Sequence, residues 1–105
     1  MKYSKKKLFI EKVSVLKIAN KFQTPAYCYS YSRLKENISI FKENFKSFSP
    51  LICFSVKSNT NLNIIKEIKK FGLGADVVSI GELMLALKAG VNPSKIVFSG
   101  VGKTN

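Results

Sequence analysis

From Ser32 onward the sequence alternates between helical stripes and short apolar runs. The runs begin near Ile52, Ala75 and Ile96, which are 23 and 21 residues apart. This spacing leaves room for one helix between consecutive strands, as parallel pairing requires. Runs that are apolar at consecutive positions are typical of strands covered on both faces. The pattern therefore predicts an α/β fold with parallel strands and about three βα units. Because the third strand lies close to Asn105, with no helix after it, the sequence looks cut short.

Three helices are predicted between and before these strands. The first follows Ser32 and carries a stripe of apolar residues at helical spacing, namely Leu34, Ile38, Phe41, Phe45 and Phe48. The second begins near Leu62, and Gly72 and Gly74 are expected to end it. Ser79 and Glu82 have the spacing of a capping box, so the third helix is expected to begin at Ser79.

The composition excludes several kinds of site. None of the 105 residues is His, which removes His-based catalytic triads and His metal sites, and no metal site is predicted. Cys28 and Cys53 lie in apolar contexts without a CxxC spacing, so we expect buried free thiols rather than a disulfide. The apolar run after the basic start is too short for a signal peptide, and no stretch is long enough to span a membrane. These features favour a cytoplasmic protein.

The net charge of +12 comes almost entirely from lysines, because Arg33 is the only Arg. The lysines are spread along the chain rather than gathered in a stripe with aromatic residues, so nucleic acid is not the expected partner. A basic binding module built on residues 2–7 stays open as an alternative, since four of these residues are lysines. A P-loop at "GVGKT" is excluded because Val97 occupies the position of its first glycine.

Lys57 is the lysine whose position suggests chemistry. It closes the apolar run "ICFSV" and is followed by polar residues, so it should lie at the carboxyl end of a strand. Ligands of α/β folds bind at these ends. Burial would favour the neutral amine, which can form a Schiff base with an aldehyde or ketone. From position alone, a lysine that merely marks the end of the strand is equally consistent.

Four blocks of sequence, in order, resemble the N-terminal part of the diaminopimelate decarboxylase family. They are "TPAYCYS", "FSVKSNTNLNIIKEI", "GLGADVVSIGEL" and "ALKAGVNPSKIVFSGVGKT". The resemblance covers residues 8–104, with departures at Ser58, Thr60 and Ile80. This family belongs to the alanine-racemase-like group, which binds pyridoxal phosphate on a (β/α)₈ TIM-like barrel with an added β-domain. The resemblance implies that residues 30–105 form part of that barrel. It also implies that residues 1–29 form an arm that packs outside the barrel or joins the β-domain.

The resemblance implies an activity and a site. The parent enzyme would be a lyase of lysine biosynthesis that decarboxylates meso-2,6-diaminopimelate to L-lysine, with Lys57 holding pyridoxal 5′-phosphate as a Schiff base. Asp76, the only Asp in the chain, could orient polar groups around Lys57 or could bond local backbone. An ornithine or arginine decarboxylase of the same fold is the alternative enzyme, and a homodimer is implied. The family's His, Gly-rich phosphate loop, Glu, Arg and Tyr are not found in these residues, so the chain alone is expected to be inactive.

Overall fold

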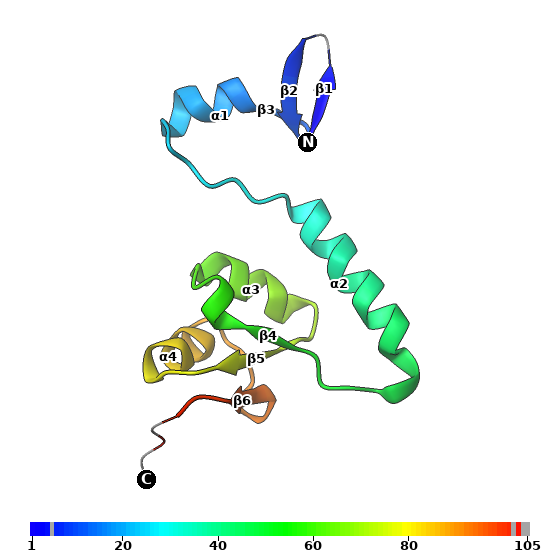
Figure 1. The fold of residues 1–105 in the computed structure, drawn as a ribbon, viewed down its shortest axis with the longest axis vertical. Coiled ribbons are helices and arrows are strands. Elements are labelled where there is room, and N and C mark those ends of the chain that lie inside the picture. Colours follow the sequence, from blue (N-terminus) through cyan, green and yellow to red (C-terminus); the bar gives the residue numbers. More distant parts are fainter. Residues whose placement is uncertain (5, 102, 104–105) are drawn as a thin grey trace. The chain divides into compact units, whose positions relative to one another are not determined.

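The computed structural model describes residues 1–4, 6–101 and 103. The chain forms two compact units, Met1–Asn44 and Phe45–Asn105 (Figure 1). The first unit begins with three short antiparallel strands, β1 (Lys2–Ser4), β2 (Lys7–Ile10) and β3 (Val13–Ser14). Tyr3 is paired with Leu8, and Phe9 with Ser14. Helix α1 (Val15–Phe22) follows directly.

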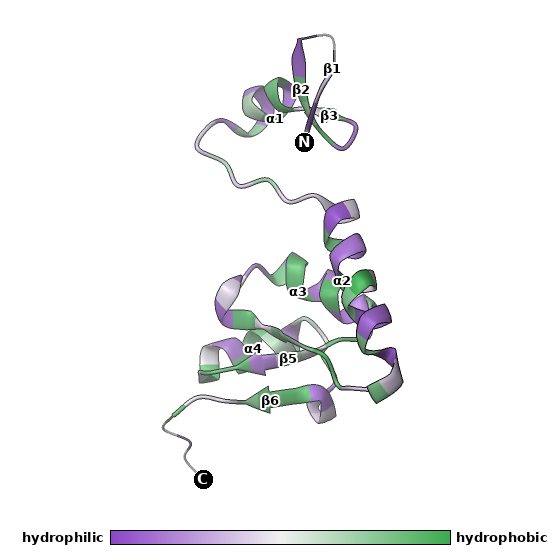
Figure 2. Ribbon diagram, turned by 45° about the vertical axis from the view of Figure 1, so that its right-hand side comes forward, coloured by the Kyte–Doolittle hydropathy of each residue, from purple (hydrophilic) through white to green (hydrophobic). Residues whose placement is uncertain are grey.

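Helix α2 (Tyr31–Phe45) completes the first unit and confirms the helix predicted after Ser32. Figure 2 shows hydrophobic and hydrophilic residues on it, as expected of an amphipathic helix. Its predicted stripe is only partly covered: Ile38 is buried, whereas Phe41 is about half exposed. Phe48 lies beyond the helix in a short 3₁₀ turn, η1 (Lys46–Phe48), and is 77% exposed.

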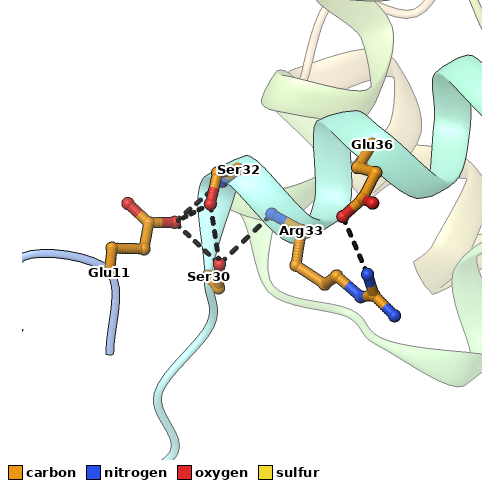
Figure 3. Close-up of polar contacts among 5 residues, drawn as sticks. All are labelled: Glu11, Ser30, Ser32, Arg33 and Glu36. Carbon is orange, nitrogen blue, oxygen red and sulfur yellow. Dashed lines mark hydrogen bonds and ion pairs between the residues drawn. The ribbon is translucent and has the colours of Figure 1, made fainter. Parts of the chain in front are cut away.

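The first turn of α2 is capped by a carboxylate from a distant part of the sequence (Figure 3). Glu11, in the turn between β2 and β3, has a left-handed φ of 55°. Its Oε1 accepts hydrogen bonds from the Ser32 backbone N–H at 2.8 Å and from the hydroxyls of Ser30 and Ser32 at 2.7 and 2.9 Å. A carboxylate at a helix N-terminus satisfies free N–H groups and complements the helix dipole. Glu11 thereby joins the small sheet to α2 within this unit.

Glu11 makes this junction sensitive to pH. The Ser32 backbone bond, followed by the Ser30 and Ser32 hydroxyl bonds, lowers the pKa of the Glu11 carboxyl from its ordinary value of 4.5. Its stabilising effect is therefore fully present above the unfolded pKa and is lost as the pH falls through the lower folded pKa. We expect Glu11→Gln to lower the protection of the Ser32 amide against hydrogen exchange at neutral pH. In this variant the protection should no longer change as the pH falls. The control is Glu36→Gln, which loses only an exposed ion pair with Arg33 and should leave the exchange of Ser32 unchanged. Unchanged exchange in Glu11→Gln would contradict the capping role of Glu11.

The second unit is a parallel sheet with helices between its strands. Strands β4 (Cys53–Ser55), β5 (Gly74–Val77) and β6 (Ile96–Phe98) lie in the order β4-β5-β6, with both pairs parallel. Helix α3 (Leu62–Lys70) connects β4 to β5, and α4 (Ile80–Lys88) connects β5 to β6. Two 3₁₀ turns, η2 (Val56–Ser58) and η3 (Pro93–Lys95), flank β4 and β6. The three predicted parallel strands are confirmed, although each is shorter than its apolar run.

The core of this unit lies between the sheet and the two helices. Ala75 and Val77 of β5 pack there with residues from η2, α3, α4 and the segment after α4, namely Val56, Ile65, Ala86, Ala89 and Val91. Side chains alternate along a strand, so Gly74 and Asp76 belong to the opposite face of the sheet. In register with Asp76 on that face are Ser55 of β4 and Val97 of β6. Val97 is 46% exposed, so this second face is open in the described part of the chain.

The helix boundaries explain three sequence signals. Ser79 caps α4 by accepting from the Glu82 N–H at 3.2 Å, and the Glu82 carboxylate reaches back to the N–H of Val78 at 2.9 Å. The predicted capping box is thus present, with its return bond shifted by one residue. Gly72 has a φ of +81° and follows the end of α3, as predicted. Gly74, in contrast, is the first residue of β5, so its predicted role as a helix breaker is wrong.

Both thiols are free, but the prediction that both are buried is wrong. Cys28 is exposed and Cys53 is partly buried. Among the described residues, no helix is long and apolar enough to cross a membrane. No group of three or more His, Cys, Asp or Glu side chains is placed to hold a metal within this same part of the chain.

Candidate active-site edge

The carboxyl ends of the three parallel strands form one edge of the second unit. Phe54, Ala75 and Ile96 are in register, so the segments that follow β4, β5 and β6 leave the sheet on the same side. Lys57, Ser79 and Ser99 follow the three strands, in that order. In α/β folds with this topology the loops at this edge bind ligands. The strand register therefore places these three positions at one edge of the sheet.

Lys57 is delivered to this edge by a tight turn. Val56 before it is fully buried, and the Asn59 N–H donates to the Val56 carbonyl at 3.1 Å, which closes the turn of η2. The Ser58 hydroxyl donates to the carbonyl of Ser55 at 2.7 Å and fixes the same turn. Because Val56 anchors the turn in the core, the position of Lys57 is set by the fold rather than by a flexible loop.

The side chain of Lys57 is exposed in this chain. The apolar run before it ends in the core at Val56, and the next residue already lies outside that core. Within the described part of the chain, the amine makes no hydrogen bond or ion pair. An exposed amine without a partner is available for bonding to an added molecule.

Asp76 lies on the open face of the sheet, on β5. The neighbouring strand, β4, is the strand that Lys57 follows. Oδ1 of Asp76 accepts a hydrogen bond of 2.5 Å from the hydroxyl of Ser99. The pKa of the Cys53 thiol is raised, first by burial and second by the negative charge of Asp76. The bond to Ser99 is a contact between strands, so Asp76 does not merely cap its own turn.

Ser99 follows the third strand and is not among the predicted site residues, Lys57 and Asp76. The signal that could have identified it is the Ser-Gly pair at the end of "IVFSG". The Ser99 N–H donates to the Val77 carbonyl at 3.0 Å and extends the pairing of β6 with β5 by one residue. A Cβ atom on Gly100 would lie 2.4 Å from the carbonyl oxygen of Val78, so only glycine lets the two loops approach this closely.

The remaining polar residues at this edge have local partners. Ser79 is occupied as the cap of α4, as predicted, and Asn59 accepts from the Asn61 N–H at 3.0 Å. The Lys103 amine lies 5.7 Å from the centre of the Phe98 ring. Gly102 and Thr104 of "GVGKT" lie outside the described residues.

Comparisons with known proteins agree on one family. The family model described as "Pyridoxal-dependent decarboxylase, pyridoxal binding domain" matches residues 31–105. The diaminopimelate decarboxylase of Aquifex aeolicus is 45% identical over 104 residues, which is 99% of this chain and 24% of that protein.

Two solved structures are similar to most of this chain. A crystal structure of diaminopimelate decarboxylase from M. jannaschii matches 98% of this chain and 25% of its own, with a TM-score of 0.93 and 36% identity. The structure of that enzyme with L-lysine matches 93% of this chain and 24% of its own, with a TM-score of 0.88 and 38% identity. The chain thus spans about a quarter of the length of the relatives that it matches.

Proposed function

The chain belongs to the pyridoxal-dependent decarboxylase family, and from this we propose that it is the N-terminal part of a diaminopimelate decarboxylase. The whole enzyme would convert meso-2,6-diaminopimelate to L-lysine and CO₂. Support for this substrate comes from relatives that carry that name and from a similar structure that contains L-lysine. The ornithine and arginine decarboxylases of the same fold are the competing assignment.

The observation that carries the proposal is the position of Lys57. Its amine is exposed at the carboxyl edge of the sheet and has no partner among the described residues, and the buried Val56 and the bonds of η2 hold its backbone. These features suit a lysine that bonds covalently to the aldehyde of pyridoxal 5′-phosphate. Bound there, the cofactor would supply an electron-withdrawing ring that stabilises negative charge on the substrate carbon as CO₂ leaves.

Lys57 has two tasks in this scheme. It would hold the cofactor at the strand end, and it would release the cofactor to the substrate amine. For both tasks its amine would act in the neutral form, which has the lone pair that the bond requires. Asp76 is proposed as a second cofactor-site residue, with a carboxylate that carries negative charge at the same edge.

We also propose an architecture for the whole enzyme. The order β4-β5-β6 and the parallel pairing suit consecutive strands of a (β/α)₈ barrel to which residues 30–105 contribute. Residues 1–29 would form an arm outside the barrel or join the β-domain. The whole enzyme would be a homodimer.

The substrate assignment is tested by release of CO₂ from the whole enzyme supplied with pyridoxal 5′-phosphate. We expect release from meso-2,6-diaminopimelate, with ornithine and arginine disfavoured by about 10⁴-fold in kcat/KM. Both lack the second carboxylate of diaminopimelate, so a site built to bind it would leave its polar groups unpaired. Comparable rates with ornithine would assign the other branch of the family. The 105-residue chain alone should release no CO₂, and release by it would contradict the proposal that the site needs further residues.

A further inference from the structure

The contact between Asp76 and Ser99 joins two strands on the open face of the sheet. The bond of 2.5 Å from the Ser99 hydroxyl to Oδ1 of Asp76 lies at the short end of the range for O–H···O bonds. Asp76 is in register with Ser55, and Lys57 follows Ser55 two positions later. The pair therefore belongs to the same edge as the proposed cofactor lysine.

The carboxylate of Asp76 carries an unneutralised charge in the described part of the chain. No Lys or Arg among those residues forms an ion pair with it, and Ser99 is its only hydrogen-bond donor there. Among the described residues, the second oxygen, Oδ2, has no donor. The raised pKa of the Cys53 thiol has this charge as its second cause, after burial.

The backbone of Ser99 is held more firmly than an ordinary loop residue. Its N–H is bonded to the Val77 carbonyl on one side, and the next residue, Gly100, lies against the Val78 carbonyl on the other. Because its backbone is fixed, the Ser99 hydroxyl can point in only a few directions. It therefore restricts the rotation of the Asp76 carboxylate that it binds.

We propose that Ser99 is a positioning residue of this site. Its hydroxyl holds Oδ1 of Asp76, so that Oδ2 is oriented to accept a hydrogen bond from an ammonium group at the carboxyl edge. Two groups in the reaction have this chemistry, namely the amine of Lys57 when it is not bonded to the cofactor and an amine of the substrate. The proposal rests on the proposed function for its catalytic consequence, but the pairing of Ser99 with Asp76 does not.

The alternative is that Ser99 only fastens β6 to β5. Both roles predict that Ser99→Ala is less stable, so stability does not separate them. They differ in whether the loss reaches catalysis in the folded enzyme. A double-mutant cycle with Asp76→Asn, measured as kcat/KM, tests this, because Ser99→Ala should cost little activity once the carboxylate is absent.

In the whole enzyme we expect Ser99→Ala to lower kcat/KM by about 10- to 100-fold, the range for losing a hydrogen bond to a charged group. Ser99→Thr keeps the hydroxyl and should recover most of the activity. A fall in kcat alone would identify Lys57 as the ammonium group, whereas a rise in KM alone would identify the substrate. Ser94→Ala is the matched control, because Ser94 donates to Asn92 at the other end of β6.

A second readout does not require activity. In the apoprotein, the rate of iodoacetamide modification of Cys53, followed by mass spectrometry of its peptide, reports the charge of Asp76 through the thiol pKa. Asp76→Asn should speed the modification, and Ser99→Ala should do so as well because the released carboxylate can turn toward water. Ser94→Ala should leave the rate unchanged.

Two results would overturn the proposal. One is an unchanged Cys53 rate in Ser99→Ala while Asp76→Asn changes it, since Ser99 would then not hold the carboxylate. The other is an equal loss of activity from Ser99→Ala with and without Asp76→Asn. If the whole enzyme releases no CO₂ from diaminopimelate, the proposed function fails, and the Cys53 rates still test the pairing.

Discussion

Replacement of Lys57 by Ala is expected to abolish CO₂ release by the whole enzyme, by about 10³-fold or more, because it removes the amine proposed to bond the cofactor. Lys57 is exposed at the strand end and lacks a partner in the described part of the chain, so its removal leaves the packing of the second unit intact. The variant should fold as wild type does, and the absorbance of lysine-bound pyridoxal phosphate should be missing. Activity, absorbance and circular dichroism are measured on the same preparation.

Two further variants separate the chemistry of Lys57 from its charge. Lys57→Arg keeps the positive charge, but its guanidinium stays protonated and cannot replace the amine, so it should be as inactive as Lys57→Ala. Lys66→Ala removes another exposed lysine, on helix α3, and should keep full activity. Substantial activity in Lys57→Arg, or an unchanged cofactor absorbance in Lys57→Ala, would show that another residue holds the cofactor.

The sequence was sufficient to predict features that depend on local patterns. Apolar runs spaced by one helix length predicted three parallel strands, and the S-x-x-E spacing placed the start of α4 at Ser79. The position of Lys57 after its strand followed from the same periodicity. These signals succeed because each is decided by residues close together in the chain.

Features that depend on contacts between strands were not predictable in the same way. The bond between Ser99 and Asp76 joins residues 23 positions apart, and no spacing rule connects them. The exposure of Lys57 depends on where the turn of η2 leaves the core, which a run of apolar letters does not reveal. The sequence pattern predicts Gly74 as a helix breaker, whereas its role is set by the backbone carbonyl of Lys95, the last residue of η3, just before β6.

Replacement of Gly74 by Ala should have the largest effect on folding. A Cβ atom there would lie 2.1 Å from the backbone carbonyl oxygen of Lys95 and 2.9 Å from the Cys53 sulfur. A backbone carbonyl cannot turn aside as a flexible side chain can, so the start of β6 must move away from β5. We expect a loss of about 3 kcal/mol in the free energy of unfolding, at the upper end for overpacking. Faster amide exchange at Val97 and a lower denaturation midpoint of the apoprotein would report it.

Gly81→Ala is the matched control for this prediction, because the glycine lies in the first turn of α4 and its nearest neighbour would be the Ser79 hydroxyl at 3.9 Å. With space available and a helical backbone, alanine should stabilise the protein by about 0.5–1 kcal/mol. The two substitutions add the same methyl group in the same unit, so opposite effects would be due to the surroundings alone. Equal midpoints for Gly74→Ala and wild type would mean that β5 and β6 do not approach as closely as described. The pairing of Ser99 with Asp76 depends on that approach and would then lose its support.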